Sequence, residues 1–159
     1  MSVCRGIKSL SIISLLALGG CQMWIAGHSD DHGLVVHGAG TANPPARTST
    51  FNLTIDGTDV TCKGESHANP DGSQTDVVNI TCDDGRVGEG TSHVVSVDVG
   101  EGNGTDSCGN GFYLTFSTNK TYIDDKLEEF RKMSQASGHA GNDKCEVPGA
   151  LPPHTDPLI

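Results

Sequence analysis

The chain has 159 residues, enough for one domain, and its 20 acidic side chains outnumber its 10 basic ones. Such a surface repels phosphate backbones, and no basic stripe with interleaved aromatic residues occurs, which argues against nucleic acid as a partner. Aromatic residues make up only 4% of the chain while 21 residues are glycine, which predicts a thin hydrophobic core with many turns.

Residues 1–20 are organised like a secretory signal peptide. Arg5 and Lys8 supply a positively charged start, and an apolar run over 10–18 is followed by two glycines and Cys21. As a helix this run rises about 14 Å, far less than the hydrocarbon core of about 30 Å. We therefore expect a cleaved signal and no stable transmembrane anchor.

The segment Leu18-Gly19-Gly20-Cys21, placed directly after this apolar run, resembles the lipobox of bacterial lipoproteins. The resemblance implies cleavage before Cys21, attachment of lipid to it and N-acylation, for example with palmitate. Several acyl chains on one residue anchor a protein stably, whereas a single chain is marginal. Gln22, not Asp, follows the cysteine, which by the sorting habit of enteric bacteria implies the outer membrane. The alternative is an ordinary signal peptide with a coincidental cysteine.

After the signal, the sequence predicts a tether and then a β-rich domain. Residues 21–48 have no sustained hydrophobic period and contain several glycines and two prolines, which predicts a flexible lipidated tether. Alternation begins near Thr50, so we expect the domain over 49–138. The apolar residues expected in strands are Phe51, Leu53, Ile55, Val60, Cys62, Val78, Ile80, Cys82, Val95, Val97, Val99, Phe112, Leu114 and Phe116.

The dipeptide Asp56-Gly57 predicts a two-residue hairpin turn. Pairing across that turn would set Leu53 opposite Val60 and Phe51 opposite Cys62, with the apolar residues on one face. The expected fold is mainly β: a small antiparallel sheet, sandwich or barrel with one packed helix, stapled by two disulfides.

One helix is expected over about 122–137, in the C-terminal half of the chain. Thr121 with Asp124 fits a capping box, and Gly138 is suited to end the helix. The apolar residues at helical spacing are Ile123, Leu127, Phe130 and Met133. This single apolar stripe predicts a helix that lies across one face of the sheet.

The cysteines predict a disulfide framework. With Cys4 removed in the signal and Cys21 lipidated, an even number remains, which in an exported chain indicates two disulfides with three possible connectivities. The remaining cysteines are Cys62, Cys82, Cys108 and Cys145. Zinc binding by these four is the weaker interpretation, because no closely spaced cysteine pair occurs and the compartment is oxidising.

We favour the pairs Cys62–Cys82 and Cys108–Cys145. Cys62 and Cys82 each end an apolar strand with the same inward parity, which makes a bridge between neighbouring strands plausible. Cys145 would then pin the start of an extended, proline-rich tail over 139–159.

One cluster of metal-ligand residues stands in the predicted tether: His28, His32 and His37 with Asp30 and Asp31. The alternative interpretation on this basis is a periplasmic zinc- or copper-binding protein. A metal site needs fixed geometry and supporting contacts, however, and a flexible tether does not supply them. We therefore assign no metal and no cofactor.

Catalytic and calcium-binding patterns are weak. His67 and the pair Ser92-His93 are candidates for a hydrolase, but no nucleophile elbow, HExxH motif or phosphate loop accompanies them. Oxygen-rich turns over 69–76 and 83–85 do not match the spacing of an EF-hand.

These patterns favour a non-enzymatic lipoprotein of the bacterial envelope, which acts through contacts with an unidentified envelope protein or surface ligand. The alternatives are a periplasmic metal-binding protein that uses the histidine-rich tether and a small periplasmic hydrolase.

Overall fold

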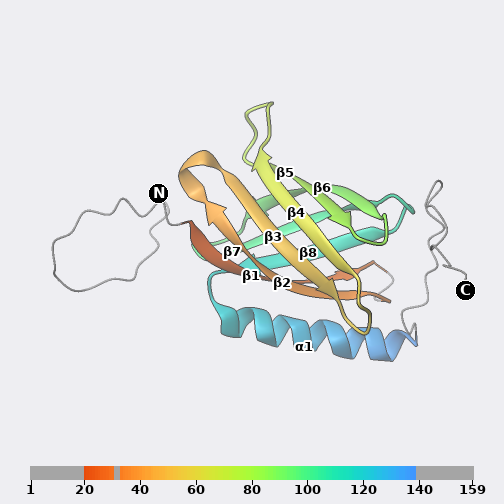
Figure 1. Ribbon diagram of the computed structural model, residues 1–159. Helices are drawn as coiled ribbons and strands as arrows, with labels where there is room; N and C mark the ends of the chain where they lie inside the picture. The colour runs from red at the N-terminus through yellow and green to blue at the C-terminus, as the bar shows by residue number, and fades with distance from the viewer. Residues whose placement is uncertain (1–19, 31–32, 139–159) are drawn as a thin grey trace, which may run out of the picture.

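The computed structural model describes residues 20–30 and 33–138 and shows a closed antiparallel barrel of eight strands with one helix on its outside (Figure 1). The elements are β1 (Cys21–Ser29), β2 (Val35–Asn43), a 3-10 turn (Pro44–Ala46), β3 (Thr48–Ile55), β4 (Thr61–Ala68), β5 (Asp76–Cys82), β6 (Val87–Val94), β7 (Val99–Asp106), β8 (Gly111–Ser117) and α1 (Lys120–Ser137). Each strand pairs with the next along the chain, and β8 closes the barrel on β1. The mainly β fold with one helix is confirmed, and it is a barrel.

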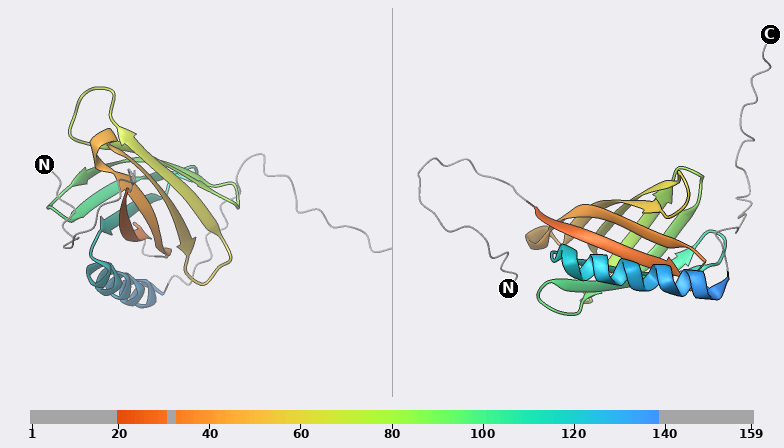
Figure 2. Two further views of the ribbon diagram at one scale, coloured as in Figure 1. Left: turned by 60° about the vertical axis from the view of Figure 1, so that its left-hand side comes forward. Right: turned by 90° about the horizontal axis from the view of Figure 1, so that it is seen from below.

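The strands alternate in direction, so their connections gather at two ends (Figures 1 and 2). We call the end where β1 begins the Cys21 end. It also carries the β2–β3, β4–β5 and β6–β7 connections and the start of α1. The connections that follow β1, β3, β5 and β7 lie at the opposite end.

The inside of the barrel is filled by large side chains that lie over glycines of the neighbouring strand. The buried residues of this inner core are Met23, Ile25, Phe51, Leu53, Ile55, Cys62, Val78, Ile80 and Leu114. Phe51 of β3 pairs with Gly64 of β4, where an added Cβ would lie 2.0 Å from the ring. Phe116 of β8 covers Gly100 of β7 in the same way, with a Cβ 2.2 Å from the ring. Glycine is needed at both positions because the aromatic ring occupies the space of a side chain.

Helix α1 packs on the outer faces of β1, β2 and β8 and forms a second core. Its buried residues are Ala26, Val35, Ile123 and Phe130, and Leu127 and Met133 pack against them. The predicted apolar stripe is thus confirmed. The predicted cap is wrong: Asn119, not Thr121, accepts hydrogen bonds from the first free backbone N–H groups. Gly138 ends the helix with a φ of 68°, as expected.

The segment 21–48 is not a tether. It forms β1, β2, the 3-10 turn and the start of β3, with β2 paired on both sides. The pattern was obscured because the inward positions of β2 include Gly38 and Gly40, whose place is taken by the backbone and side chains of β3. Period-2 alternation is visible only where an inward residue has an apolar side chain.

The β3–β4 hairpin differs from the prediction in its turn. Leu53 lies opposite Cys62 and Phe51 opposite Gly64, and Ile55 N donates to Val60 O at 3.1 Å. The turn therefore spans more than Asp56-Gly57, and the register moves by two positions. A shift of two keeps every side chain on its predicted face, which is why the apolar pattern did not reveal it.

The predicted strand Val95-Val97-Val99 is also wrong. β6 ends at Val94 and β7 begins at Val99, and the residues between them form an exposed turn. The strands on both sides have Gly or Ser at most inward positions, so their apolar alternation is weaker than that of the turn itself.

Cys62 and Cys82 lie directly opposite each other on β4 and β5 and form a disulfide with an S–S distance of 2.05 Å, which confirms that pair. Cys21 and Cys108 are each disulfide-bonded as well. The predicted pairing of Cys108 involves residue 145, and it stays a prediction because 139–159 lies outside the described residues, as do the signal residues 1–19. The helix of the described part is not long and apolar enough to cross a membrane.

Candidate functional site

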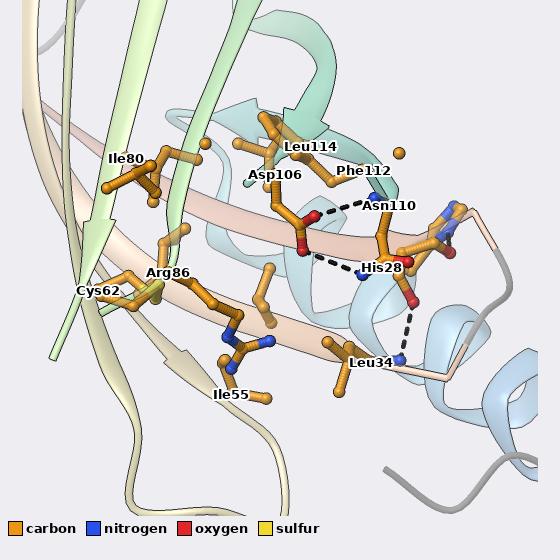
Figure 3. A pocket seen from close by; sticks show the side chains of 17 residues that line it. His28, Leu34, Ile55, Cys62, Ile80, Arg86, Asp106, Asn110, Phe112 and Leu114 are labelled. Atoms are coloured by element: carbon orange, nitrogen blue, oxygen red, sulfur yellow. Dashed lines mark hydrogen bonds between the residues drawn. A yellow bond between two sulfur atoms is a disulfide. The ribbon is translucent and has the colours of Figure 1, made fainter. Parts of the chain in front are cut away.

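The end of the barrel opposite Cys21 opens into a cavity of about 90 Å³, which we call the cup (Figure 3). Its apolar lining includes Leu34, Ile55, Ile80, Phe112 and Leu114. A water molecule takes about 30 Å³ in the liquid, and an apolar cavity of about 150 Å³ binds benzene. The cup therefore has room for one small apolar group.

The cup is lined by inward-facing side chains near the ends of several strands. Ile55 ends β3, and Phe112 and Leu114 stand near the start of β8. The Cys62–Cys82 disulfide joins β4 to β5 within the wall. A covalent link at this point fixes two neighbouring strands beside the cavity.

An ion pair borders the mouth of the cup. Arg86 Nη2 and Nε lie 2.7 Å and 2.8 Å from Asp84 Oδ2, and only 14% of the Arg86 side chain is exposed. Burial acts to raise the pKa of Asp84, but the hydrogen bonds and charge of Arg86 outweigh it and hold the pKa below its usual value of 3.8. Asp84 therefore neutralises the guanidinium beside the apolar lining.

A second carboxylate holds the β7–β8 turn at the same mouth. Asp106 accepts a hydrogen bond from the backbone N–H of Cys108 at 2.9 Å. It also accepts from the backbone N–H of Asn110 at 2.9 Å and from the Asn110 side chain at 3.2 Å (Figure 3). Ser29 Oγ accepts from Leu34 N at 2.9 Å within the β1–β2 connection at this mouth. These polar groups are used to shape the rim, and the lining inside it is apolar. Such a site suits an uncharged apolar group.

A clasp of three side chains ties α1 to the barrel near the cup. Asp56 in the β3–β4 turn lies 2.6 Å from Arg131 Nε and 2.7 Å from His37 Nδ1. Burial acts to raise the pKa of Asp56, but Arg131 and His37 outweigh it and lower the pKa below 3.8. The clasp fixes the late turns of α1 beside the β3–β4 hairpin.

The histidine cluster of the sequence is divided. His37 contacts Asp56, whereas the His28 ring packs edge-on against Phe130 with centroids 4.7 Å apart. Residues 31 and 32 lie outside the described residues. Within 20–30 and 33–138, no three potential ligands come close enough to hold a metal ion.

The residues considered for a hydrolase stand on opposite faces of the barrel wall. Ser92 is buried and points inward, while His67 and His93 are exposed on the outer face. The oxygen-rich turns use their carboxylates locally: Asp71 accepts from Ser73 N at 2.7 Å, and Asp83 accepts from Thr61 N.

Sequence reasoning did not single out the cup. Ile55, Ile80 and Leu114 were predicted as strand residues, but their common position at one end depends on barrel closure. No sequence pattern marked Arg86 as a residue of the cup, because its position depends on the β5–β6 turn. That turn is closed by a hydrogen bond from Cys82 N to Arg86 O at 2.8 Å. Knowledge of the β5–β6 turn geometry would have been needed to find it.

No family model matches the chain, and no curated protein matches it. Among solved structures, a redesigned β-barrel, mFAP1, bound to DFHBI, is 21% identical, with a TM-score of 0.51 over 63% of this chain and 94% of that one. A de novo designed fluorescence-activating β-barrel is 20% identical, with a TM-score of 0.51 over 62% of this chain and 91% of that one. At these identities the likeness is one of fold alone.

Proposed function

We propose that this protein is a non-enzymatic lipoprotein of the bacterial envelope, held at the outer membrane by acylated Cys21. At the opposite end of the barrel, the cup binds a partner. The lipobox-like segment before Cys21 supports the anchor. The position of Cys21 as first residue of β1 supports the polarity, because an anchor there leaves the cup facing away from the bilayer.

The observation that carries the binding role is the apolar lining of the cup. Apolar side chains around an open cavity remain in contact with water unless another molecule covers them, and concave apolar sites with a few polar groups at the rim are typical binding sites. The cavity of about 90 Å³ fits a small apolar group such as one aliphatic side chain of a protein partner.

The anchor is tested by the chemical state of the Cys21 sulfur. This sulfur is disulfide-bonded in the full-length chain, whereas lipid attachment requires it as a thiol before folding, so the two states exclude each other. Intact-mass analysis of the protein from bacterial membranes should find a chain that begins at Cys21 and carries acyl groups. A Cys21→Ala variant should lose those groups. An unlipidated chain that retains residues 1–20 would contradict the proposed anchor.

The binding role is tested by photocrosslinking from the cup. p-Benzoylphenylalanine in place of Val87, which lines the cup, should form a discrete adduct with an envelope component. The same group in place of Thr91, exposed on the same face of β6 but four residues nearer the Cys21 end and away from the cup, serves as the matched control. Leu34→Trp, which fills the cavity, should abolish the adduct from position 87. An adduct that survives this filling, or that forms equally from both positions, would argue against the cup.

A further inference from the structure

The β6–β7 turn exposes three valines at the Cys21 end of the barrel. The exposed fractions of Val94, Val95 and Val97 are 71%, 55% and 83%. We call these residues the valine turn. They are three of the four large hydrophobic residues exposed in the described part of the chain, and the fourth, Val87, lies at the cup end. The apolar surface is thus concentrated at one end.

The valine turn stands close to Cys21 across the sheet. Trp24 of β1, Ser117 of β8 and Val99 of β7 form one row of neighbouring residues, and β1 and β7 run in the same direction. Two strand spacings of about 4.8 Å separate β1 from β7 along that row. The start of β1 and the β6–β7 turn lie at the same end in the right-hand view of Figure 2.

The two features also lie on the same side of that row. Cys21 precedes Trp24 by three positions and Val97 precedes Val99 by two. At about 3.3 Å per strand residue, Cys21 lies about 10 Å beyond the common row, and the valine turn adjoins Val99 on the same side of that row. Because Cys21 is itself the first strand residue, no tether stands between a lipid on it and the barrel.

From this placement we infer that the valine turn inserts into the bilayer beside the acyl chains of Cys21 and fixes the barrel upright on the membrane. The inference rests on the proposed acylation of Cys21. Apolar side chains held at the boundary of headgroups and acyl chains gain the burial that they lack in water. The acidic chain has formal charge −10, so apolar insertion rather than attraction to anionic lipids supplies the contact.

Brominated phospholipids test the inference, because bromine on acyl chains quenches tryptophan that is inserted among them. The chain has one tryptophan, so Trp24→Phe gives a protein without tryptophan fluorescence of its own. Val97→Trp in this protein places the only tryptophan in the valine turn. Val87→Trp, at an exposed valine of the cup end, is the matched control. Both acylated proteins are reconstituted in phosphatidylcholine vesicles with and without bromine on the acyl chains.

We expect at least twofold stronger quenching from position 97 than from position 87, together with a blue-shifted emission at position 97. Equal quenching at the two positions, in protein whose intact mass shows an acylated Cys21, would overturn the inference and leave the anchor in place. Blue-shifted emission at position 97 that bromine does not quench would show that a second copy covers the turn, and would overturn it too. An unacylated mass would instead refute the anchor, and the inference with it.

A second measurement on the unsubstituted chain guards against misfolding of the variants. Hydrogen exchange of the backbone amides in 95–98 should be slower in vesicles than in the unlipidated Cys21→Ser protein in buffer. The β7–β8 turn at the cup end should exchange equally in both. Unchanged exchange over 95–98 in acylated protein would contradict insertion.

Discussion

The cup end and the Cys21 end are built from the same eight strands but are held in different ways. At the cup end, the Cys62–Cys82 disulfide and the Asp84–Arg86 pair border a cavity, and the Asp56 clasp ties α1 to the outside of the barrel. At the Cys21 end, the valine turn is exposed and stands beside the start of β1. A cavity that packing does not fill needs covalent and polar links to keep its shape, whereas an apolar turn needs only a surface that covers it.

The largest expected effect concerns the helix packed on the outside of the barrel. Phe130→Ala should lower the free energy of unfolding by about 3–5 kcal/mol, because it empties a buried site against the rings of His28 and Tyr113. Urea unfolding followed by circular dichroism measures the change. Met133→Ala, a partly buried member of the same stripe, should cost clearly less. Equal losses would mean that α1 is not fixed chiefly at Phe130.

Next in size is the disulfide in the wall of the cup. The double change Cys62→Ser and Cys82→Ser should cost about 3 kcal/mol, because the bridge closes a loop with a sequence separation of 20. Ser49→Ala with Ser66→Ala removes a cross-strand hydroxyl pair near the Cys21 end and should cost at most about 1 kcal/mol. Similar losses from both pairs would remove the distinction between the ends.

The clasp predicts a dependence on pH. The folded-state pKa of Asp56 is lowered, so its stabilisation is complete above the unfolded value of 3.8 and is lost as the pH falls toward the folded pKa. Arg131 and His37 are substantially exposed, at 47% and 41%, and solvent screening limits the stabilisation to about 1 kcal/mol. Asp56→Asn should therefore lower stability at pH 7, and the difference from wild type should shrink below pH 3.8. A difference that is constant with pH would contradict the clasp.

The smallest effect on stability is expected at the valine turn. Val97→Asp should change the free energy of unfolding of the Cys21→Ser protein by less than about 0.5 kcal/mol, because the side chain is 83% exposed. A loss of more than about 1 kcal/mol would show that Val97 supports the fold itself.

The sequence predicted the elements whose inward residues are large. Phe51, Leu53 and Ile55 of β3 and the stripe of α1 alternate with polar residues, so their periods were visible. The Cys62–Cys82 pair followed from matching strand positions. Asn119 was missed as the cap because Thr121 with Asp124 also fits a capping box.

The elements that escaped prediction are those whose inward residues are small. Gly38 and Gly40 in β2, and Gly100 and Gly104 in β7, leave their inward space to side chains and backbone of other strands. Hydrophobic alternation cannot reveal an inward position where the residue has no apolar side chain. The cup could not be predicted from the sequence, because its lining residues come from strands that are distant in sequence. Only closure of the barrel brings the ends of these strands together.

The central claim is that each end of the barrel meets a different partner, and paired photocrosslinking tests it most directly. p-Benzoylphenylalanine is placed at position 97 in one acylated protein and at position 87 in another, and the adducts formed in intact bacteria are identified by mass spectrometry. We predict lipid adducts from position 97 and adducts without lipid from position 87. The same class of adduct from both positions would contradict the account.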